Sequence, residues 1–304
     1  MEQKSMTALV SAFARAHHSK QKEIKIFDDY LAKEVLTRQE YNQIAGYMSK
    51  GIDFFNPSFD GTEDKALQWV VDNQLSPSPL GRAAFSEEML ENAVKIGAEQ
   101  YLIFAAGYDT FAYRQPDWAE NIEVFELDHP DMIADKQKRV HDIAEQRPAN
   151  LHYVAVDFEK DYWQSRLFDC KAFDQNKNSF CSLLGISYYL SKENFSGVVQ
   201  VLSKYIPKGS SVIFDYPDEN TYTENAGERT KKQVAIAEAA NEKMYASYSY
   251  LEMEKLLADN SFLIYEHLTP DEITERFFKK YNEAYPQHQM TAFDNVNYCL
   301  AVKR

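Results

Sequence analysis

YLIFAAGYDTFAYR, residues 101–114, is the stretch of sequence that decides the fold. Its first four residues are apolar, too few for a helix and rich in aromatic and branched side chains, which indicates a strand buried on both faces. The small residues Ala105, Ala106 and Gly107 follow, and they allow another group to approach the backbone. Asp109-Thr110 then predicts the start of a helix. A buried strand, a small-residue turn and a helix start together predict the ligand-binding corner of a doubly wound α/β sheet.

An acidic residue after the next strand indicates what this corner binds. The second strand is predicted at 122–127, and it leads to Asp128. An acid about twenty residues after the turn is typical of folds that bind ribose hydroxyls, which indicates a nucleoside-containing cofactor. The turn lacks the glycines that a pyrophosphate needs, and Asp109 would repel that anion. A nucleoside cofactor without phosphate therefore fits better, and S-adenosyl-L-methionine is the common one.

The rest of the chain predicts one α/β domain over 1–304. Strands and helices alternate from residue 100 onward, which predicts a mostly parallel sheet. Five more strands are expected, at 151–156, 180–186, 211–216, 262–266 and 296–302. Helices are expected at 131–145, after Ser191, at 250–259 and at 270–283. Residues 1–80 are expected to form an N-terminal helical cap, with helices over 5–50. The part at 51–81, where Gly and Pro are frequent, is expected to be irregular and interrupted by a short helix around 66–71.

The connection 217–250 interrupts the alternation of strands and helices. It is long and polar, and Ala, Glu and Lys are frequent over 231–246, which predicts a helix there. An extended connection at the carboxyl edge of a sheet is a candidate lid over a ligand site. We therefore expect 217–250 to be a helical lid insertion that encloses a small or medium-sized acceptor.

Composition excludes several kinds of partner. The formal net charge of −14 would repel a polyanion, so no nucleic-acid partner is expected. No stretch approaches the roughly twenty apolar residues of a membrane span, and the N-terminus does not resemble a signal peptide. Cysteine is sparse and odd in number, which favours reduced thiols in the cytoplasm. The Cys and His residues show no ligand spacing, so no metal site is expected.

Taken together, the motifs resemble the leucine carboxyl methyltransferase family, which belongs to the class I S-adenosylmethionine-dependent methyltransferases. The family includes bacterial O-methyltransferases linked to polyketide biosynthesis. The resemblance implies a Rossmann-like sheet of seven strands in the order 3-2-1-4-5-7-6, with helices on both faces. The residues that carry it are Arg15-Ala16, Phe27-Asp28-Asp29, Arg82, Ala105 to Thr110, Tyr113-Arg114, Phe125 to Pro130, Lys136 and Val156-Asp157-Phe158.

The same resemblance implies roles for individual residues. Arg82 would pair with the methionine carboxylate of the cofactor, and Gly107 would let the backbone approach the methionyl part. Asp128 would accept hydrogen bonds from both ribose hydroxyls. Asp157 would accept one from the adenine amino group, while the backbone of Phe158 would bind the ring edge. The predicted set of cofactor contacts is completed by Ala105, His129 and Leu184.

Leu184 is a departure from the family pattern, and it leaves the acceptor open. Many family members have Glu at this place, in a Glu-Gly-…-Tyr-Leu pattern, and the missing carboxylate removes one partner of the cofactor's ammonium or of the acceptor. A carboxylate acceptor needs no base, whereas a hydroxyl acceptor needs one. Candidate bases near the strand ends are Tyr188, Asp215 and Tyr216, with His129 further off. The alternative for the tyrosines is a structural role in a chain with 20 of them.

The sequence therefore predicts an S-adenosylmethionine-dependent O-methyltransferase acting on a carboxylate or hydroxyl. A small-molecule acceptor is expected, and a protein C-terminal carboxylate is the other acceptor that the resemblance allows. A nicotinamide-dependent oxidoreductase is the alternative enzyme class, disfavoured by the missing phosphate turn. A homologue that binds the cofactor without catalysis is the non-enzymatic alternative, and Leu184 in place of the family Glu is the only residue that favours it.

Overall fold

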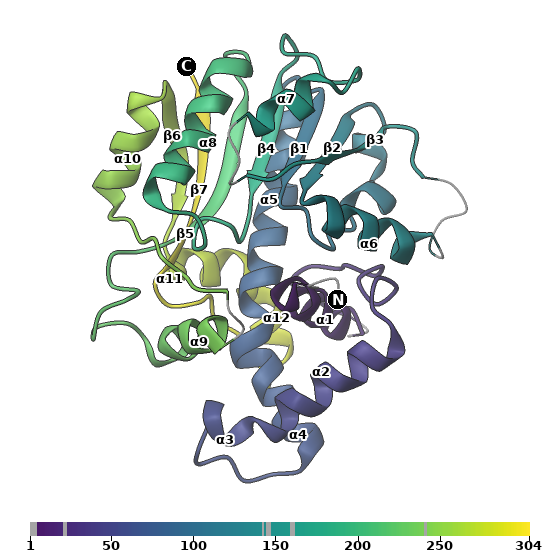
Figure 1. Ribbon diagram of the computed structural model, residues 1–304. Coiled ribbons are helices and arrows are strands. Elements are labelled where there is room, and N and C mark those ends of the chain that lie inside the picture. The colour runs from purple at the N-terminus through teal and green to yellow at the C-terminus, as the bar shows by residue number, and fades with distance from the viewer. Residues whose placement is uncertain (1–4, 21–22, 142, 144–146, 159–161, 240–241) are drawn as a thin grey trace.

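A seven-stranded sheet forms the centre of the molecule (Figure 1). The computed structural model describes residues 5–20, 23–141, 143, 147–158, 162–239 and 242–304. The strand order is β3-β2-β1-β4-β5-β7-β6, as predicted, and only β7 runs antiparallel to its neighbours. The strands are β1 Gln100–Phe104, β2 Glu123–Asp128, β3 Leu151–Ala155, β4 Ser179–Leu183, β5 Ser211–Pro217, β6 Phe262–Leu268 and β7 Val296–Lys303.

The central strands are buried along their whole length, because helices cover both faces of the sheet. Every residue of β1, β4 and β5 is buried, as expected for parallel strands between two helical layers. Alternate side chains of β1 enter opposite layers, with Ile103 in one apolar cluster and Leu102 in the other. The continuous apolar runs of the sequence therefore correspond to strands. The predicted fourth strand extends three residues too far, since β4 ends at Leu183 and Gly185 turns the chain with φ +70°.

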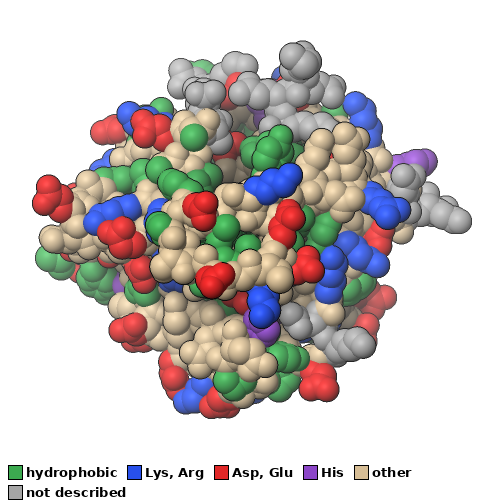
Figure 2. All heavy atoms as spheres, turned by 90° about the horizontal axis from the view of Figure 1, so that it is seen from below, with side chains coloured by type: hydrophobic (Ala, Val, Ile, Leu, Met, Phe, Trp, Pro, Cys, Tyr) green, Lys and Arg blue, Asp and Glu red, His purple; other side chains and the backbone are tan. Residues whose placement is uncertain are grey.

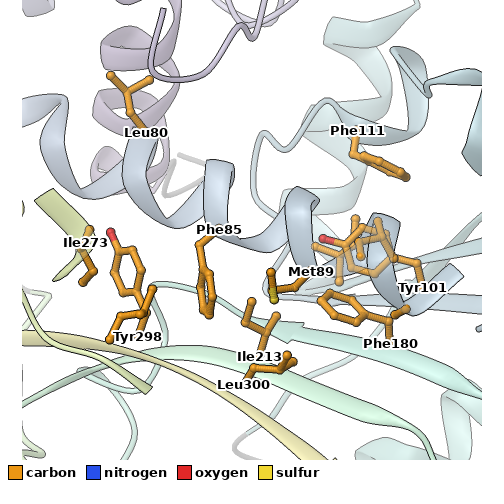
Figure 3. Packing of buried hydrophobic residues seen from close by; sticks show 14 of the residues in the cluster. Leu80, Phe85, Met89, Tyr101, Phe111, Phe180, Ile213, Ile273, Tyr298 and Leu300 are labelled. Carbon is orange, nitrogen blue, oxygen red and sulfur yellow. The ribbon is translucent and has the colours of Figure 1, made fainter. Parts of the chain in front are cut away.

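One face is covered mainly by α5 (Pro77–Lys95), together with α11 (Pro270–Ile273), η4 (Thr274–Phe278) and α12 (Lys279–Ala284). Figure 3 shows Phe85 and Met89 of α5 above Ile213 and Leu300 of the sheet. The other face is covered by α7 (Trp163–Phe168), α8 (Lys192–Tyr205) and α10 (Tyr250–Asp259). The helices predicted after Ser191 and at 250–259 are confirmed, and Ser191 caps α8 by accepting from the N–H of Asn194 at 3.1 Å.

The N-terminal part forms a separate apolar cluster below the sheet in Figure 1. It contains α1 (Met6–His18), α2 (Arg38–Lys50), α3 (Ile52–Phe55), α4 (Glu63–Val70) and the π-helical turn η1 (Val71–Leu75). The prediction of helices over 5–50 is wrong for 23–36, which form turns and bends before Thr37 caps α2. The assignment of 51–81 is wrong in part: the short helix expected around 66–71 is confirmed as α4, but α3, η1 and the first turn of α5 are helical as well. Pro77 by itself is typical of a loop, but a proline is tolerated in the first turn of a helix, where its missing N–H is not needed.

The helix predicted to start at Asp109-Thr110 does not form. Only two short 3₁₀ turns, η2 (Phe111–Tyr113) and η3 (Asp117–Ala119), connect β1 to β2. Asp109 accepts a hydrogen bond from the N–H of Phe111 at 2.7 Å, so the local turn does form. Pro116 follows closely, and its lack of an N–H prevents a longer helix.

Two predicted helices extend into residues that the structure does not describe. The helix expected at 131–145 is α6 (Pro130–Val140), and 142 and 144–146 lie outside the described residues. The helix expected at 231–246 is α9 (Glu228–Ala239); residues 240–241 are not described, and 243–246 are not helical. Within the described ranges, no helix is both long and apolar enough to cross a membrane.

Candidate functional site

A cavity of about 1080 Å³ lies at the carboxyl ends of β1, β2 and β4. Parallel α/β sheets bind their ligands at this edge. The opposite walls come from α1, α2, α5, η1, α9 and the segment 242–245. The volume is at the upper end of the roughly 300–1,000 Å³ typical of ligand pockets, so the cavity has room for two reactants. Of the predicted site residues, those that line it are Arg82, Ala105, Gly107, Asp128, His129, Leu184 and Tyr188.

The turn after β1 is bonded to the end of β2. Ala105 and Gly107 both have positive φ angles, +49° and +50°, and a non-glycine residue in this region is typical of functional sites. The N–H of Gly107 donates to Oδ2 of Asp128 at 2.7 Å, and the N–H of His129 donates to Oδ1 at 2.7 Å. A carboxylate oxygen has two lone pairs, so Asp128 can still accept two hydroxyl donors. Burial raises the pKa of Asp128, although these two N–H groups oppose the shift.

Arg82 is held by a network that starts at β5. Its Nη1 lies 3.6 Å from Oδ2 of Asp215, a carboxylate with no exposed surface. The N–H of Gly185 donates to Oδ1 of Asp215 and the hydroxyl of Tyr188 donates to Oδ2, both at 2.6 Å. The guanidinium lies against Gly185, because a Cβ added there would be 2.4 Å from Nη1. Burial alone would lower the pKa of Arg82, but the charge of Asp215 together with the nearby tyrosines more than offsets burial, so the pKa is raised.

The two candidate tyrosines have different environments. Tyr188 lines the cavity, and burial together with Asp215 raises its pKa well above the ordinary value. It therefore keeps its proton and acts as a hydrogen-bond donor rather than a base. Tyr216 is fully buried, is not among the residues lining the cavity, and has its hydroxyl 2.7 Å from Nε2 of His267. The structure thus brings only Tyr188 to the site.

Asp157 and Phe158 follow β3 and are not among the residues lining the cavity. Asp128 is the register partner of Ala155, so Asp157 lies two residues beyond that pair, at the same edge of the sheet. The ring of Phe158 packs against Phe104, with 5.7 Å between ring centroids. The adenine contacts assigned to these two residues stay a prediction.

The N-terminal motifs are explained by a buried ionic cluster at the β1 turn. Arg15 of α1 donates from Nη2 to the carbonyl oxygen of Tyr108 at 2.8 Å, and its Nε lies 3.3 Å from Oδ2 of Asp29. Thr110 donates to Oδ1 of Asp29 at 2.5 Å, and Nε of Arg114 lies 3.5 Å from the same oxygen. This cluster fixes the N-terminal segment to the turn that forms the cavity floor.

Sequence reasoning missed two polar side chains of the cavity wall, Gln74 in η1 and Glu242 after α9. Oε1 of Gln74 and Oε2 of Glu242 are shielded from solvent, and neither has a hydrogen-bond partner in the part of the chain that the structure describes. Neither residue belongs to a motif, so no signal in the sequence marks them; tertiary structure alone brings them to the cavity.

Sequence comparison identifies the family. The family model described as leucine carboxyl methyltransferase matches residues 8–203. YktD of Bacillus subtilis, which is named as an S-adenosyl-L-methionine-dependent methyltransferase, is 39% identical over 305 residues, covering 99% of this chain and 98% of YktD. A Mycolicibacterium smegmatis protein with a similar name is 31% identical over 148 residues, covering 49% of each chain. The chain belongs to the leucine carboxyl methyltransferase family, as the sequence predicted.

Solved structures show the same fold. A DUF574 family protein from Streptomyces avermitilis has a TM-score of 0.61 at 12% identity, covering 97% of both chains. A Thermobifida fusca protein named as a methyltransferase has a TM-score of 0.57 at 13% identity, covering 100% of this chain and 96% of its own. At these identities the likeness establishes the architecture only.

The polar groups of the cavity fit S-adenosylmethionine, the cofactor of this class of methyltransferase. Arg82 supplies a cation for a carboxylate, and Asp128 supplies free lone pairs for a pair of hydroxyls. Gly107 leaves space at the turn, since a Cβ added there would have only Ala8 and Ala105 within 4 Å. Among the described residues no group of three or more His, Cys, Asp and Glu side chains could hold a metal ion.

Proposed function

We propose that this methyltransferase transfers the methyl group of S-adenosylmethionine to an oxygen atom of a small or medium-sized acceptor. The observation that carries the proposal is the composition of the cavity wall opposite the strand ends. This wall is largely apolar and includes Val10, Ile44, Met48, Val234, Ile236, Met244 and Phe293. An apolar cavity wall on this side suits a small organic acceptor better than it suits an acceptor group on a protein surface.

The bound sulfonium makes its methyl group electrophilic, so the protein has mainly to align the reactants and exclude water. Arg82 would bind the methionine carboxylate, in an orientation fixed by Asp215 and Gly185. Asp128 would accept from the ribose hydroxyls, and Asp157 with the backbone of Phe158 would hold adenine. None of these side chains needs to change its protonation state during the reaction.

The segment 217–250 supports an enclosed acceptor through its described residues. Lys232 donates to the carbonyl oxygen of Phe55 at 2.7 Å, which connects α9 to the N-terminal helices. The N–H of Tyr245 donates to the carbonyl oxygen of Tyr188 at 2.8 Å, which fixes the end of the segment beside β4. This lid would exclude water from the methyl group. On the face shown in Figure 2, acidic and basic side chains are interspersed, which suits neither a polyanion nor a membrane surface.

Methyl-labelled S-adenosylmethionine tests the proposal. We expect the intact protein to transfer label to a low-molecular-weight fraction of a bacterial metabolite extract, and the Asp128→Ala variant to transfer far less. Label found only in proteins would contradict the small acceptor. Absence of any transfer, with the cofactor bound normally in calorimetry, would contradict catalysis itself.

A further inference from the structure

Glu242 presents a carboxylate at the acceptor side of the cavity. Its Oε1 accepts from the hydroxyl of Ser5, the N-cap of α1, at 3.3 Å, whereas Oε2 is shielded from solvent and has no hydrogen-bond partner among the described residues. Burial, and then the charge of Glu242, raise the pKa of Tyr189 to about 12. Tyr189 follows Tyr188, so Glu242 lies close to the network that holds Arg82.

Apart from Asp131, which is exposed beside His129, the other acids of the cavity wall already have partners among the described residues. Glu87 pairs with Arg114, Asp135 with Arg139, and Asp128 accepts from two backbone N–H groups. Asp109 accepts from the N–H of Phe111. An unpaired, shielded carboxylate oxygen such as Oε2 of Glu242 costs free energy unless a ligand supplies a donor.

Gln74 provides a second, independent oxygen atom that needs a hydrogen-bond donor from a ligand. The residue is 3% exposed and lines the cavity, and its amide Oε1 has no hydrogen-bond partner within the described ranges. It lies in a π-helical turn, a form often found at functional sites. An ionised carboxylate offers only acceptors, whereas a hydroxyl group offers a donor. Both unpaired oxygens therefore match an acceptor that carries hydroxyl groups.

The cations of the cavity wall do not favour a carboxylate acceptor. Arg15 is paired with Asp29, and Arg82, which Asp215 orients, is assigned to the carboxylate of the cofactor rather than to the acceptor. Lys243 is exposed, so its charge is screened by water. An ionised carboxylate near Glu242 would instead meet a like charge, which is unfavourable in a shielded site.

We propose that Glu242 is the general base of this enzyme and that the acceptor is a hydroxyl compound, such as a phenol, rather than a carboxylate. The inference rests on the proposed methyl transfer to oxygen. The acceptor oxygen forms the new C–O bond as the C–S bond of the methyl donor breaks, and the C–S electron pair remains on sulfur. The proton of the acceptor passes to Oε2 of Glu242, so that charge and atoms balance.

The stability of the labelled product to alkali tests the acceptor class. The protein is incubated with methyl-labelled S-adenosylmethionine and the small-metabolite extract, and the product is treated with mild alkali. A methyl ether keeps its label, whereas a methyl ester releases labelled methanol. We expect alkali-stable label; labelled methanol as the main product would overturn the inference and leave the proposed O-methylation intact. Absence of any labelled product would overturn both.

The Glu242→Gln variant tests the base itself, and Glu238→Gln is the matched control. Glu238 is an exposed acid of α9 that does not line the cavity. A positioned base contributes about 10²–10⁴-fold, so we expect kcat of Glu242→Gln to fall by at least about 10²-fold. Its activity should recover as the pH approaches the pKa of the acceptor hydroxyl, where no base is needed. The control should keep the native rate and pH profile.

Binding measurements separate this role from the alternatives. S-adenosylhomocysteine should bind Glu242→Gln as tightly as it binds the native protein. If its affinity fell while that of methylthioadenosine, which lacks the amino-acid tail, did not, Glu242 would be a partner of the cofactor's ammonium and the base assignment would be wrong. A native rate in Glu242→Gln would also overturn it.

Discussion

Gly185 acts at the scale of a single residue, because it allows Arg82 and Asp215 to meet. Its positive φ and the 2.4 Å approach of Nη1 to an added Cβ leave no room for a side chain. We expect Gly185→Ala to displace the guanidinium and to weaken S-adenosylhomocysteine by about 10- to 100-fold, the value of a charge-assisted hydrogen bond. Methylthioadenosine should keep its affinity, and isothermal titration calorimetry would measure both.

Gly197 provides the matched control for that substitution. It lies inside α8 with no atom within 4 Å of an added Cβ. Gly197→Ala should leave both affinities unchanged and stabilise the helix by up to about 1 kcal/mol. Equal loss of both ligands in Gly185→Ala would indicate a folding defect instead of a displaced arginine.

Asp128 makes cofactor binding depend on pH. The proposed contacts to the ribose hydroxyls require the ionised carboxylate, and burial raises the pKa of Asp128 above the ordinary value of an aspartate. The affinity for S-adenosylhomocysteine should therefore be full well above the raised pKa and fall as the pH drops through it. Titrations over a pH series would show this loss beginning at a higher pH than an ordinary aspartate gives. Asp128→Asn should bind weakly at every pH, and a native-like pH dependence in that variant would assign the effect to another group.

At the scale of elements, the ionic cluster around Asp29 attaches the N-terminal segment to the β1 turn. Asp29 is fully buried between Arg15 and Arg114. Asp29→Ala leaves two buried guanidinium groups short of a partner, and breaking a buried pair costs about 3–5 kcal/mol. Urea denaturation should show a loss of this size in the free energy of unfolding.

The neighbouring acid is a control for that prediction. Asp28 has a half-exposed side chain and pairs only with Lys25 in the described ion pairs, at 2.7 Å. Exposed pairs contribute at most about 1 kcal/mol, so Asp28→Ala should change the stability little. Similar losses in both variants would show that the cluster adds nothing beyond surface charge.

The lid proposal is tested on the described parts of 217–250. If these residues close over the cavity, hydrogen exchange over 217–239 and 242–250 should slow when S-adenosylhomocysteine binds. The strands β1 and β4 should exchange slowly in both states and serve as the internal reference. If exchange in the segment is unchanged with the cofactor product and an acceptor both bound, the segment does not close over the cavity and the lid proposal is wrong.

At the scale of the whole molecule, the sheet could be predicted from the sequence, and the helical cap only in part. A buried parallel strand is a continuous apolar run, so β1 and β5 are visible in the sequence itself. The start of α5 was missed because Pro77 signals both a loop and a first helical turn. Local pattern cannot distinguish these two without the contacts made by the rest of the helix.

The residues of the candidate site could likewise be predicted from the sequence only in part. Asp128 could be predicted, since its place after a strand follows from topology. Gln74 and Glu242 could not, because they are separated by more than half the chain and are brought together with the strand ends only by packing. The role of Asp215 was also hidden, as a buried acid at a strand end does not reveal the arginine that it holds.

The position of β7 has a consequence for synthesis. This strand lies between β5 and β6 and pairs with both, yet it is translated after each of them. β5 and β6 therefore leave the ribosome before β7 is available to pair with them. Their unpaired edges can meanwhile pair with strands of other polypeptides. Only when residue 303 has emerged can the last strand enter and close the sheet. A nascent chain stalled before that point would be a target for chaperones and proteases.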